Sequence, residues 1–173
     1  MPLVIEDGTQ VPNANSYITL VEARAYAELR GVALPTDDAS VEASIVLSFD
    51  YTQSFESRYQ GTRTDPAVQR AAFPREGVVL FGSSIDGDVI PYTLKDAQSQ
   101  AVIESQSFAL QQSSNGKFVT KEKVDVLEVS YAPPSSGSSS VAQPDFPAVD
   151  SLLQPLFKSS VGGLASTLTT IRI

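Results

Sequence analysis

Residues 91–113 constrain the fold most, because they form one long predicted helix with apolar side chains on two faces. The stretch begins at Pro91, whose missing N–H costs nothing at a helix start, and contains no further proline or glycine. At about 100° per residue, one face carries Leu94, Ala97, Ala101, Ser105 and Phe108, edged by Val102 and Ala109. A second stripe, pointing almost the opposite way, carries Ile103 and Leu110 with Ser99 and Gln106.

Two apolar faces allow two interpretations of this helix. It is either buried on both sides within one domain, or it packs inward on its own domain and outward on another protein. Periodicity does not separate the two. On the second interpretation, Ile103 and Leu110 are candidate contacts between subunits.

Two further helices are predicted upstream. The first runs from Leu20 to about Arg30, starts with a capping box of Thr19 and Glu22, and ends at Gly31. Its inner face is Leu20, Ala23 and Ala27, with Tyr26 alongside.

The second upstream helix runs from about Ala39 to Tyr59, after an acidic start at Asp37 and Asp38. One stripe consists of Val41, Ile45, Ser48, Thr52, Phe55 and Tyr59, and Val46, Leu47 and Tyr51 widen it. This arc is broader than one neighbouring element requires. Val46 and Leu47 therefore join the candidate contacts between subunits.

Extended segments are expected at Leu3 to Ile5, at Val78 to Phe81 as a strand or buried loop, and at Phe118 to Tyr131. In the last of these, Leu127, Val129 and Tyr131 alternate with polar residues, and a turn near Val124 and Asp125 allows a hairpin. Two strands alone are marginally stable in water, so this hairpin is predicted to need a partner surface.

The C-terminal part divides into three pieces. Residues 133–145 are a Ser- and Pro-rich linker, 146–157 are a short apolar helix interrupted by Pro155, and 159–173 are rich in β-forming residues. The last piece is either an arm that adds to another chain's sheet edge or a frayed terminus. We therefore expect a core over residues 1–132, the linker, and a C-terminal helix and arm over 146–173.

The composition narrows the function classes. The 173 residues suit one domain, and the hydrophobic fraction of 42% is that of a globular protein. The net charge of −8 argues against a general nucleic-acid binder, because duplex affinity rests on Lys and Arg. The N-terminus does not resemble a signal peptide, and no segment approaches the roughly 20 apolar residues of a membrane span. We expect a soluble, non-secreted protein.

Few constellations in this chain could carry chemistry. With no Cys and no His, thiolate and imidazole metal sites and a His general base are excluded. Asp86-Gly87-Asp88 with Asp96 lacks the ligand pattern of an EF-hand and is better explained as a solvated turn. We expect no enzyme, no cofactor and no metal.

A loose basic stretch offers the only nucleic-acid signal. It consists of Arg58, Arg63, Arg70 and Arg75, with Tyr59 and Phe73 among them. Arginine and aromatic residues together can bind single strands, whereas arginines spread over a proline-interrupted loop more often form salt bridges.

Several phrases, in order, resemble tailed-phage head-to-tail connector (portal adaptor) proteins, a type of sequence also labelled DnaT-like single-strand-binding. They begin with Glu6-Asp7-Gly8-Thr9, Val11-Pro12, Ala14-Asn15-Ser16-Tyr17, Glu22-Ala23 and Ala25-Tyr26. They continue with Phe73-Pro74-Arg75, Gly77-Val78, Ile90-Pro91 and Leu94-Lys95-Ala97, where this chain inserts Asp96. They end with Glu122-Lys123-Val124, Val129-Ser130-Tyr131-Ala132, Pro147-Ala148-Val149-Asp150, Leu152-Leu153 and Leu156.

The resemblance implies a mainly α (α+β) fold: a core of three to four helices, a protruding β-hairpin and an extended C-terminal arm. It also implies a ring, usually dodecameric, beneath the portal of a virion assembled in the host cytoplasm. The expected partners are the portal protein and the next neck or tail protein. Genomic DNA would pass through the ring without specific binding, and no membrane is involved. The expected portal-binding residues are Leu152, Leu153, Leu156, Phe157, Leu164, Leu168, Ile171 and Ile173.

Two alternatives remain open. One is a single-stranded DNA-binding, DnaT-like module that uses the basic stretch. The other is a different neck protein, either a head-completion protein or a tail terminator.

Overall fold

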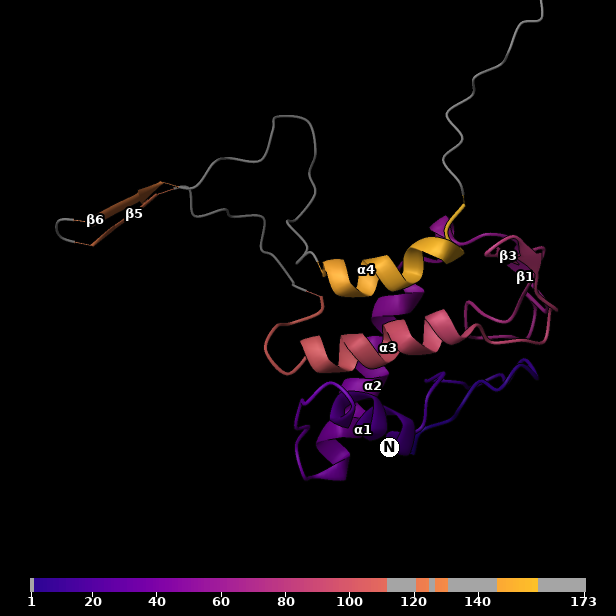
Figure 1. Ribbon diagram of the computed structural model, residues 1–173, viewed down its shortest axis with the longest axis horizontal. Coiled ribbons are helices and arrows are strands. Elements are labelled where there is room, and N and C mark those ends of the chain that lie inside the picture. Colours follow the sequence, from indigo (N-terminus) through magenta and orange to yellow (C-terminus); the bar gives the residue numbers. More distant parts are fainter. Residues whose placement is uncertain (1, 112–120, 125–126, 131–145, 159–173) are drawn as a thin grey trace, which may run out of the picture.

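The computed structural model describes residues 2–111, 121–124, 127–130 and 146–158, and within them the fold is mixed α+β (Figure 1). The helices are α1 (Leu20–Glu28), α2 (Asp38–Gln53), α3 (Tyr92–Glu104) and α4 (Pro147–Leu153), with 3₁₀ turns η1 (Glu56–Arg58) and η2 (Gln154–Leu156). Three antiparallel pairs join β1 (Thr62–Arg63) to β2 (Arg75–Glu76), β3 (Val79–Leu80) to β4 (Ser83–Ser84), and β5 (Lys121–Val124) to β6 (Leu127–Ser130).

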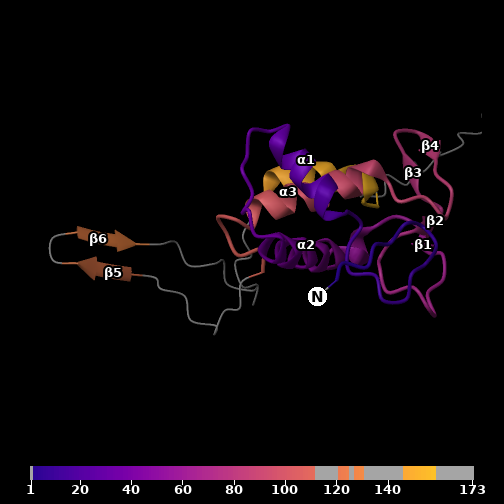
Figure 2. The same ribbon diagram turned by 90° about the horizontal axis from the view of Figure 1, so that it is seen from below.

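Helix α3 is the centre of this arrangement, because α1, α2 and α4 all pack against it. Figure 1 shows α4 alongside α3 and α2 crossing behind α3, and β1 to β4 gather at one end of the helices (Figures 1 and 2). Its buried side chains are Thr93, Leu94, Ala97, Gln98, Ser99, Ala101 and Val102. This helix is therefore covered on several sides within one protomer, which is the first of the two interpretations drawn from its periodicity.

Helix α3 is also shorter than the sequence indicated. It ends at Glu104 because polar side chains take over the next backbone acceptor: Ser105 Oγ and Gln106 Nε2 both donate to the Val102 carbonyl, at 2.7 and 3.0 Å. Leu110, outside the helix, folds back and is 5% exposed, whereas Phe108 is 60% exposed.

The upstream helices begin as predicted and end earlier. The capping box of Thr19 and Glu22 is present at α1, and Asp37 caps α2 by accepting the Ser40 N–H at 2.9 Å. Helix α2 ends at Gln53, where the Ser54 hydroxyl donates to the Tyr51 carbonyl. The predicted stripe continues past the helix, and Tyr59 is fully buried beyond η1.

The extended segments are reduced to short pieces. Residues 3–5 form only an isolated parallel bridge, Ile5 with Ser16. Residues 79–84 form the β3–β4 hairpin, and β5 and β6 pair as the predicted ribbon, with Val124 opposite Leu127 (Figure 2). The linker over 133–145 and the arm over 159–173 lie outside the described residues.

The core consists of two clusters. The larger unites the N-terminal loop, α2, α3, α4 and residues 71–80; helix α4 joins it through Val149 and Leu153, and η2 through Leu156. The smaller lies under α1 and contains Ile18, Ala23, Val41, Ile45 and Val102. Among the helices described, none is long and apolar enough to cross a membrane.

One buried amide joins the N-terminal loop, α2 and α3. The Gln98 side chain is fully buried; its oxygen accepts the Tyr17 N–H at 2.9 Å, and its nitrogen donates to Ser16 Oγ and the Ile45 carbonyl at 3.0 and 3.1 Å. One side chain thus supplies the acceptor of the Tyr17 N–H and two further hydrogen bonds, to Ser16 and Ile45.

We predict that Gln98→Leu lowers the free energy of unfolding by about 2 kcal/mol, because it keeps the volume, removes three hydrogen bonds and leaves the buried Tyr17 N–H without its acceptor. Urea denaturation followed by circular dichroism measures this change. Gln100→Leu, two residues along the same helix and only half-buried, is the matched control and should cost under about 0.5 kcal/mol. Equal losses in both variants would refute the bridging role of Gln98.

Candidate interaction surfaces

The first phrase of the resemblance builds a loop around a buried carboxylate. Glu6 is 0% exposed, and its oxygens accept the N–H groups of Gly8, Gln10 and Val11 at 2.9, 3.1 and 2.8 Å. Burial raises the pKa of Glu6, while these three hydrogen bonds oppose the rise. A side chain at Gly8, where φ is +107°, would meet the Asp88 carbonyl. The conformation of this loop therefore depends on both Glu6 and Gly8.

Tyr17, the last residue of the Ala14-Asn15-Ser16-Tyr17 phrase, is completely buried. Its hydroxyl oxygen accepts hydrogen bonds from Gln53 Nε2 at 2.9 Å and from the Phe73 N–H at 3.0 Å. Burial raises the pKa of Tyr17 far above its ordinary range. The tyrosine thus fastens the Phe73-Pro74-Arg75 segment to α2 in its neutral form.

Arg75, from the same segment, is 6% exposed, and its guanidinium bonds within the protomer. Its guanidinium donates to the carbonyls of Gln60, Gly61 and Ala72 at 2.7, 2.8 and 3.1 Å. Burial lowers the pKa of Arg75. Glu6, Tyr17 and Arg75 therefore hold the fold together and are not exposed to a partner.

The basic stretch does not form a platform for a single strand, and its alternative interpretation, salt bridges within the loop, applies to Arg63 and Arg75. Tyr59 and Phe73 are 0% exposed and face each other at 5.1 Å in the core, so neither can stack on a base. The guanidinium of Arg63 donates to both carboxylate oxygens of Glu56 at 2.6 Å and also to the Gln69 carbonyl.

Of the four arginines, Arg58 and Arg70 are exposed. The guanidinium of Arg58 lies 4.0 Å from the centre of the Phe157 ring and 5.3 Å from that of Phe55. Beside it, Lys158 Nζ donates to the Ser57 carbonyl at 3.0 Å. We call Arg58, Phe157 and Lys158 the cationic corner.

The acidic turn carries no metal site in the described structure. Asp86 and Asp88 are exposed, and within the residues described no group of three Asp or Glu side chains comes together to hold an ion. Thr64 Oγ1 donates to the Gly87 carbonyl, and this hydrogen bond holds the Asp86-Gly87-Asp88 turn against Thr64.

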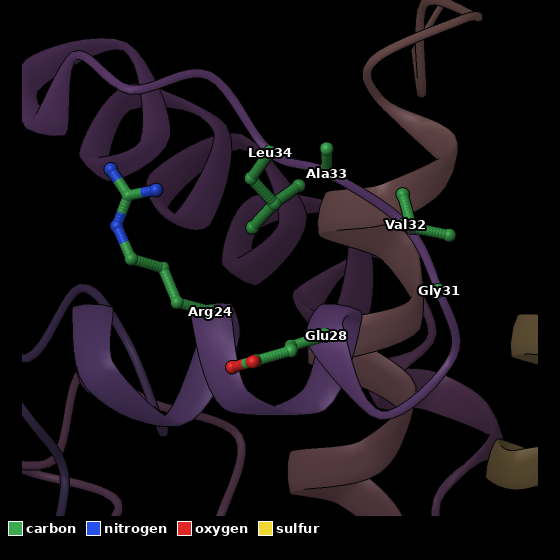
Figure 3. Close-up of a pocket in the computed structure, with 6 residues that line it drawn as sticks. All are labelled: Arg24, Glu28, Gly31, Val32, Ala33 and Leu34. Atoms are coloured by element: carbon green, nitrogen blue, oxygen red, sulfur yellow. The ribbon is translucent and has the colours of Figure 1, made fainter.

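A shallow hollow of about 400 Å³ lies between α1 and the loop that follows it. Figure 3 shows Arg24 and Glu28 on the helix, with Val32, Ala33 and Leu34 on the loop. Arg24 is already bound to the Pro35 carbonyl at 2.9 Å and to Asp38 at 2.7 Å. The guanidinium of Arg24 therefore stabilises the connection between α1 and α2.

Among the described residues, large apolar side chains are exposed in three groups, and Val68 is a further exposed residue. Val21 lies on α1 and Leu29 is the C-cap residue of that helix, 75% and 85% exposed, with exposed Ala25 between them; we call these three the α1 stripe. Leu47 and Phe108, 58% and 60% exposed, border a groove of about 280 Å³ between α2 and the end of α3.

The third group is the hairpin surface, which we define as Val79, Phe81, Val89 and Tyr92, each between 42% and 70% exposed. Phe81 stands in the two-residue turn between β3 and β4 with φ of +50°, followed by Gly82 at +84°. For a residue other than glycine, this left-handed conformation costs about 1–2 kcal/mol.

The contact residues expected from the sequence are now placed. Leu47 is exposed, and Val46, Ile103, Leu152 and Phe157 are half-buried. Leu110, Leu153 and Leu156 are buried in the larger core cluster of their own protomer, so we no longer propose them as contacts. Leu164, Leu168, Ile171 and Ile173 lie outside the described residues.

The α1 stripe and the hairpin surface were not identified from the sequence. The spacing of Val21, Ala25 and Leu29 at every fourth residue was the available signal for the α1 stripe. The pair of Phe81 and Tyr92, by contrast, comes from separate elements brought to 6.5 Å by the fold, and no local pattern indicates it.

The comparison with known families gives one result. Residues 1–172 match the family described as "Putative DnaT-like ssDNA binding protein", and the chain belongs to this family. No curated protein and no solved structure matches the chain. The DnaT-like label given with the resemblance is thus confirmed. The description agrees with the single-strand-binding alternative rather than with the connector reading, on which the comparisons are silent.

We predict a pH dependence for the pair of Glu56 and Arg63. The hydrogen bond from Arg63 holds the pKa of Glu56 below its ordinary 4.5, so the folded state binds fewer protons there than the unfolded state. The stability that the pair adds is present above pH 4.5 and is lost as the pH falls through the lowered pKa. Glu56→Gln should cost about 1 kcal/mol at pH 7 and nothing in strong acid, measured by urea denaturation. Glu76→Gln, an exposed charge on β2, is the control.

Proposed function

We propose that this protein is a structural head-to-tail adaptor of a tailed phage, which forms a ring beneath the portal and docks the next neck protein. The exposure of large apolar side chains on separate elements carries the proposal. Val21 and Leu29 lie on α1, whereas Leu47 and Phe108 lie beside α2 and α3. A ring needs two different surfaces on each copy, because a head-to-tail contact closes by repetition.

Three further observations support this function. The ordered phrases that resemble connectors run through most of residues 6–156, and their best-placed members, Glu6, Tyr17 and Arg75, maintain a rigid protomer. The net charge of −8 suits a conduit, since an acidic lumen repels phosphates and lets DNA slide. The hairpin β5–β6 is an underpaired ribbon suited to a neighbouring surface. The role is structural and located in the virion, with no catalysis.

We predict that the full chain forms rings, alone or with portal protein, visible by negative-stain electron microscopy. The double substitution Val21→Ser and Leu29→Ser should abolish the rings and leave the melting temperature unchanged, because both side chains are solvated in the protomer. Val68→Ser, which removes a valine that is 50% exposed in a loop, is the control and should assemble normally. A protein that stays monomeric with and without portal would refute the adaptor function.

Single-stranded DNA binding is the second candidate, and the family description favours it. The cationic corner of Arg58, Phe157 and Lys158 is where it would occur, since a guanidinium held flat on an aromatic ring can stack on a base. Against it stand the net charge and the burial of Tyr59 and Phe73.

A salt titration of oligonucleotide binding, followed by fluorescence anisotropy, separates the two functions. The adaptor account predicts no binding at micromolar protein. Micromolar affinity that falls steeply with salt and drops about tenfold in Arg58→Ser would establish the second candidate instead. Arg70→Ser removes one positive charge from an exposed site away from Phe157 and is the matched control.

A further inference from the structure

The aromatic pair on the hairpin surface has no function within the protomer's core. Phe81 and Tyr92 are 70% and 60% exposed, and their rings stack on each other at 6.5 Å with an angle of 28°. Val79 and Val89, close to the pair in the sequence, are 47% and 42% exposed. Exposed apolar patches of this kind mark contact sites more often than isolated side chains do.

The turn chemistry supports the same conclusion. Two-residue turns with positive φ at both positions favour Asn-Gly, because asparagine tolerates the left-handed region. This chain places Phe81 there, at φ of +50°, although the fold does not bury its ring. Phenylalanine is disfavoured in this left-handed conformation, and its ring adds nothing to the core. A contact made by the side chain explains its presence at this position.

The end of the described chain lies next to this hairpin. The Gln60 side chain accepts the Val79 N–H at 3.1 Å and donates to the carbonyls of Val79 and Pro155, at 3.3 and 2.9 Å. Three residues after Pro155, the Lys158 N–H donates to the Arg58 carbonyl. The turn η2 thus packs against β3, and the described chain ends at Lys158, two residues after η2.

We infer that the C-terminal segment, residues 159–173, binds the hairpin surface of its own protomer before assembly. The segment carries Leu164, Leu168, Ile171 and Ile173 as apolar residues, and Arg172 is its one charged side chain. An extended chain of this length reaches about 50 Å, which is ample for a surface that includes β3, the strand packed against η2.

The contact is made by side chains and not by an added strand at Val79. Gln60 already occupies both the N–H and the carbonyl of that residue, so the outer edge of β3 is capped there. The tether makes binding within one chain strongly favoured over binding between dilute chains, because the local concentration of the segment is in the millimolar range.

The full chain offers a clean optical test, because it contains no tryptophan. Phe81→Trp places a single fluorophore on the hairpin surface. We expect its emission to shift to longer wavelength, and its quenching by iodide to increase, when Leu168→Ser and Ile171→Ser are added. Phe108→Trp, at a site of similar exposure on another surface, should not respond to the same tail substitutions.

Two results would overturn the inference. An emission of the Phe81→Trp variant that ignores the tail substitutions would show that the segment does not cover the hairpin. An emission that responds to them but also changes on dilution would assign the contact to a neighbouring copy's segment. A far-ultraviolet dichroism spectrum of each variant confirms folding. The test needs no ring, so its failure is distinguishable from a failure of the adaptor function.

Discussion

The hydrogen bonds of the Gln98 amide are the constraint on which the rest of the structure depends. The N-terminal loop forms one isolated bridge and no helix, yet its Tyr17 and Ser16 lie fully buried beside α2 and α3. Gln98 holds them there by accepting the Tyr17 N–H and donating to Ser16 Oγ and to the Ile45 carbonyl of α2. With the loop in place, Tyr17 holds Phe73 and the segment that carries Arg75, and these position β1 to β4.

The phrases of the resemblance and the exposed apolar surfaces are therefore different parts of this molecule. Glu6, Tyr17 and Arg75 are buried and spend their polar groups on their own backbone. The α1 stripe and the hairpin surface carry none of those hydrogen bonds and leave large apolar groups in water. On the adaptor proposal, this division lets a chain keep those phrases while its contacts with other proteins lie on side chains outside them. It also explains why the arginines near Phe73 do not form a DNA platform.

Sequence reasoning reached the helices and the ribbon because their signals are local. The capping box at Thr19, the acidic start at Asp37 and the alternation after Leu127 each act within a few residues. Helix ends were overestimated where Ser54 and Ser105 compete for backbone carbonyls. The exposed surfaces were largely missed, since which face of α3 is covered depends on α4, far along the chain. The pairing of Phe81 with Tyr92 depends in the same way on the whole fold.

Hydroxyl-radical footprinting of the full chain, first dilute and then assembled, tests this division most directly. The account predicts that dilute protein is oxidised at Leu29, Tyr92 and Phe108 and is protected at Tyr17 and Tyr59. On assembly, Leu29 and Phe108 should lose most of their labelling while the buried tyrosines stay unchanged. Oxidation of Tyr17 as strong as that of Tyr92 in the dilute protein, or unchanged labelling of Leu29 in the assembled one, would contradict it.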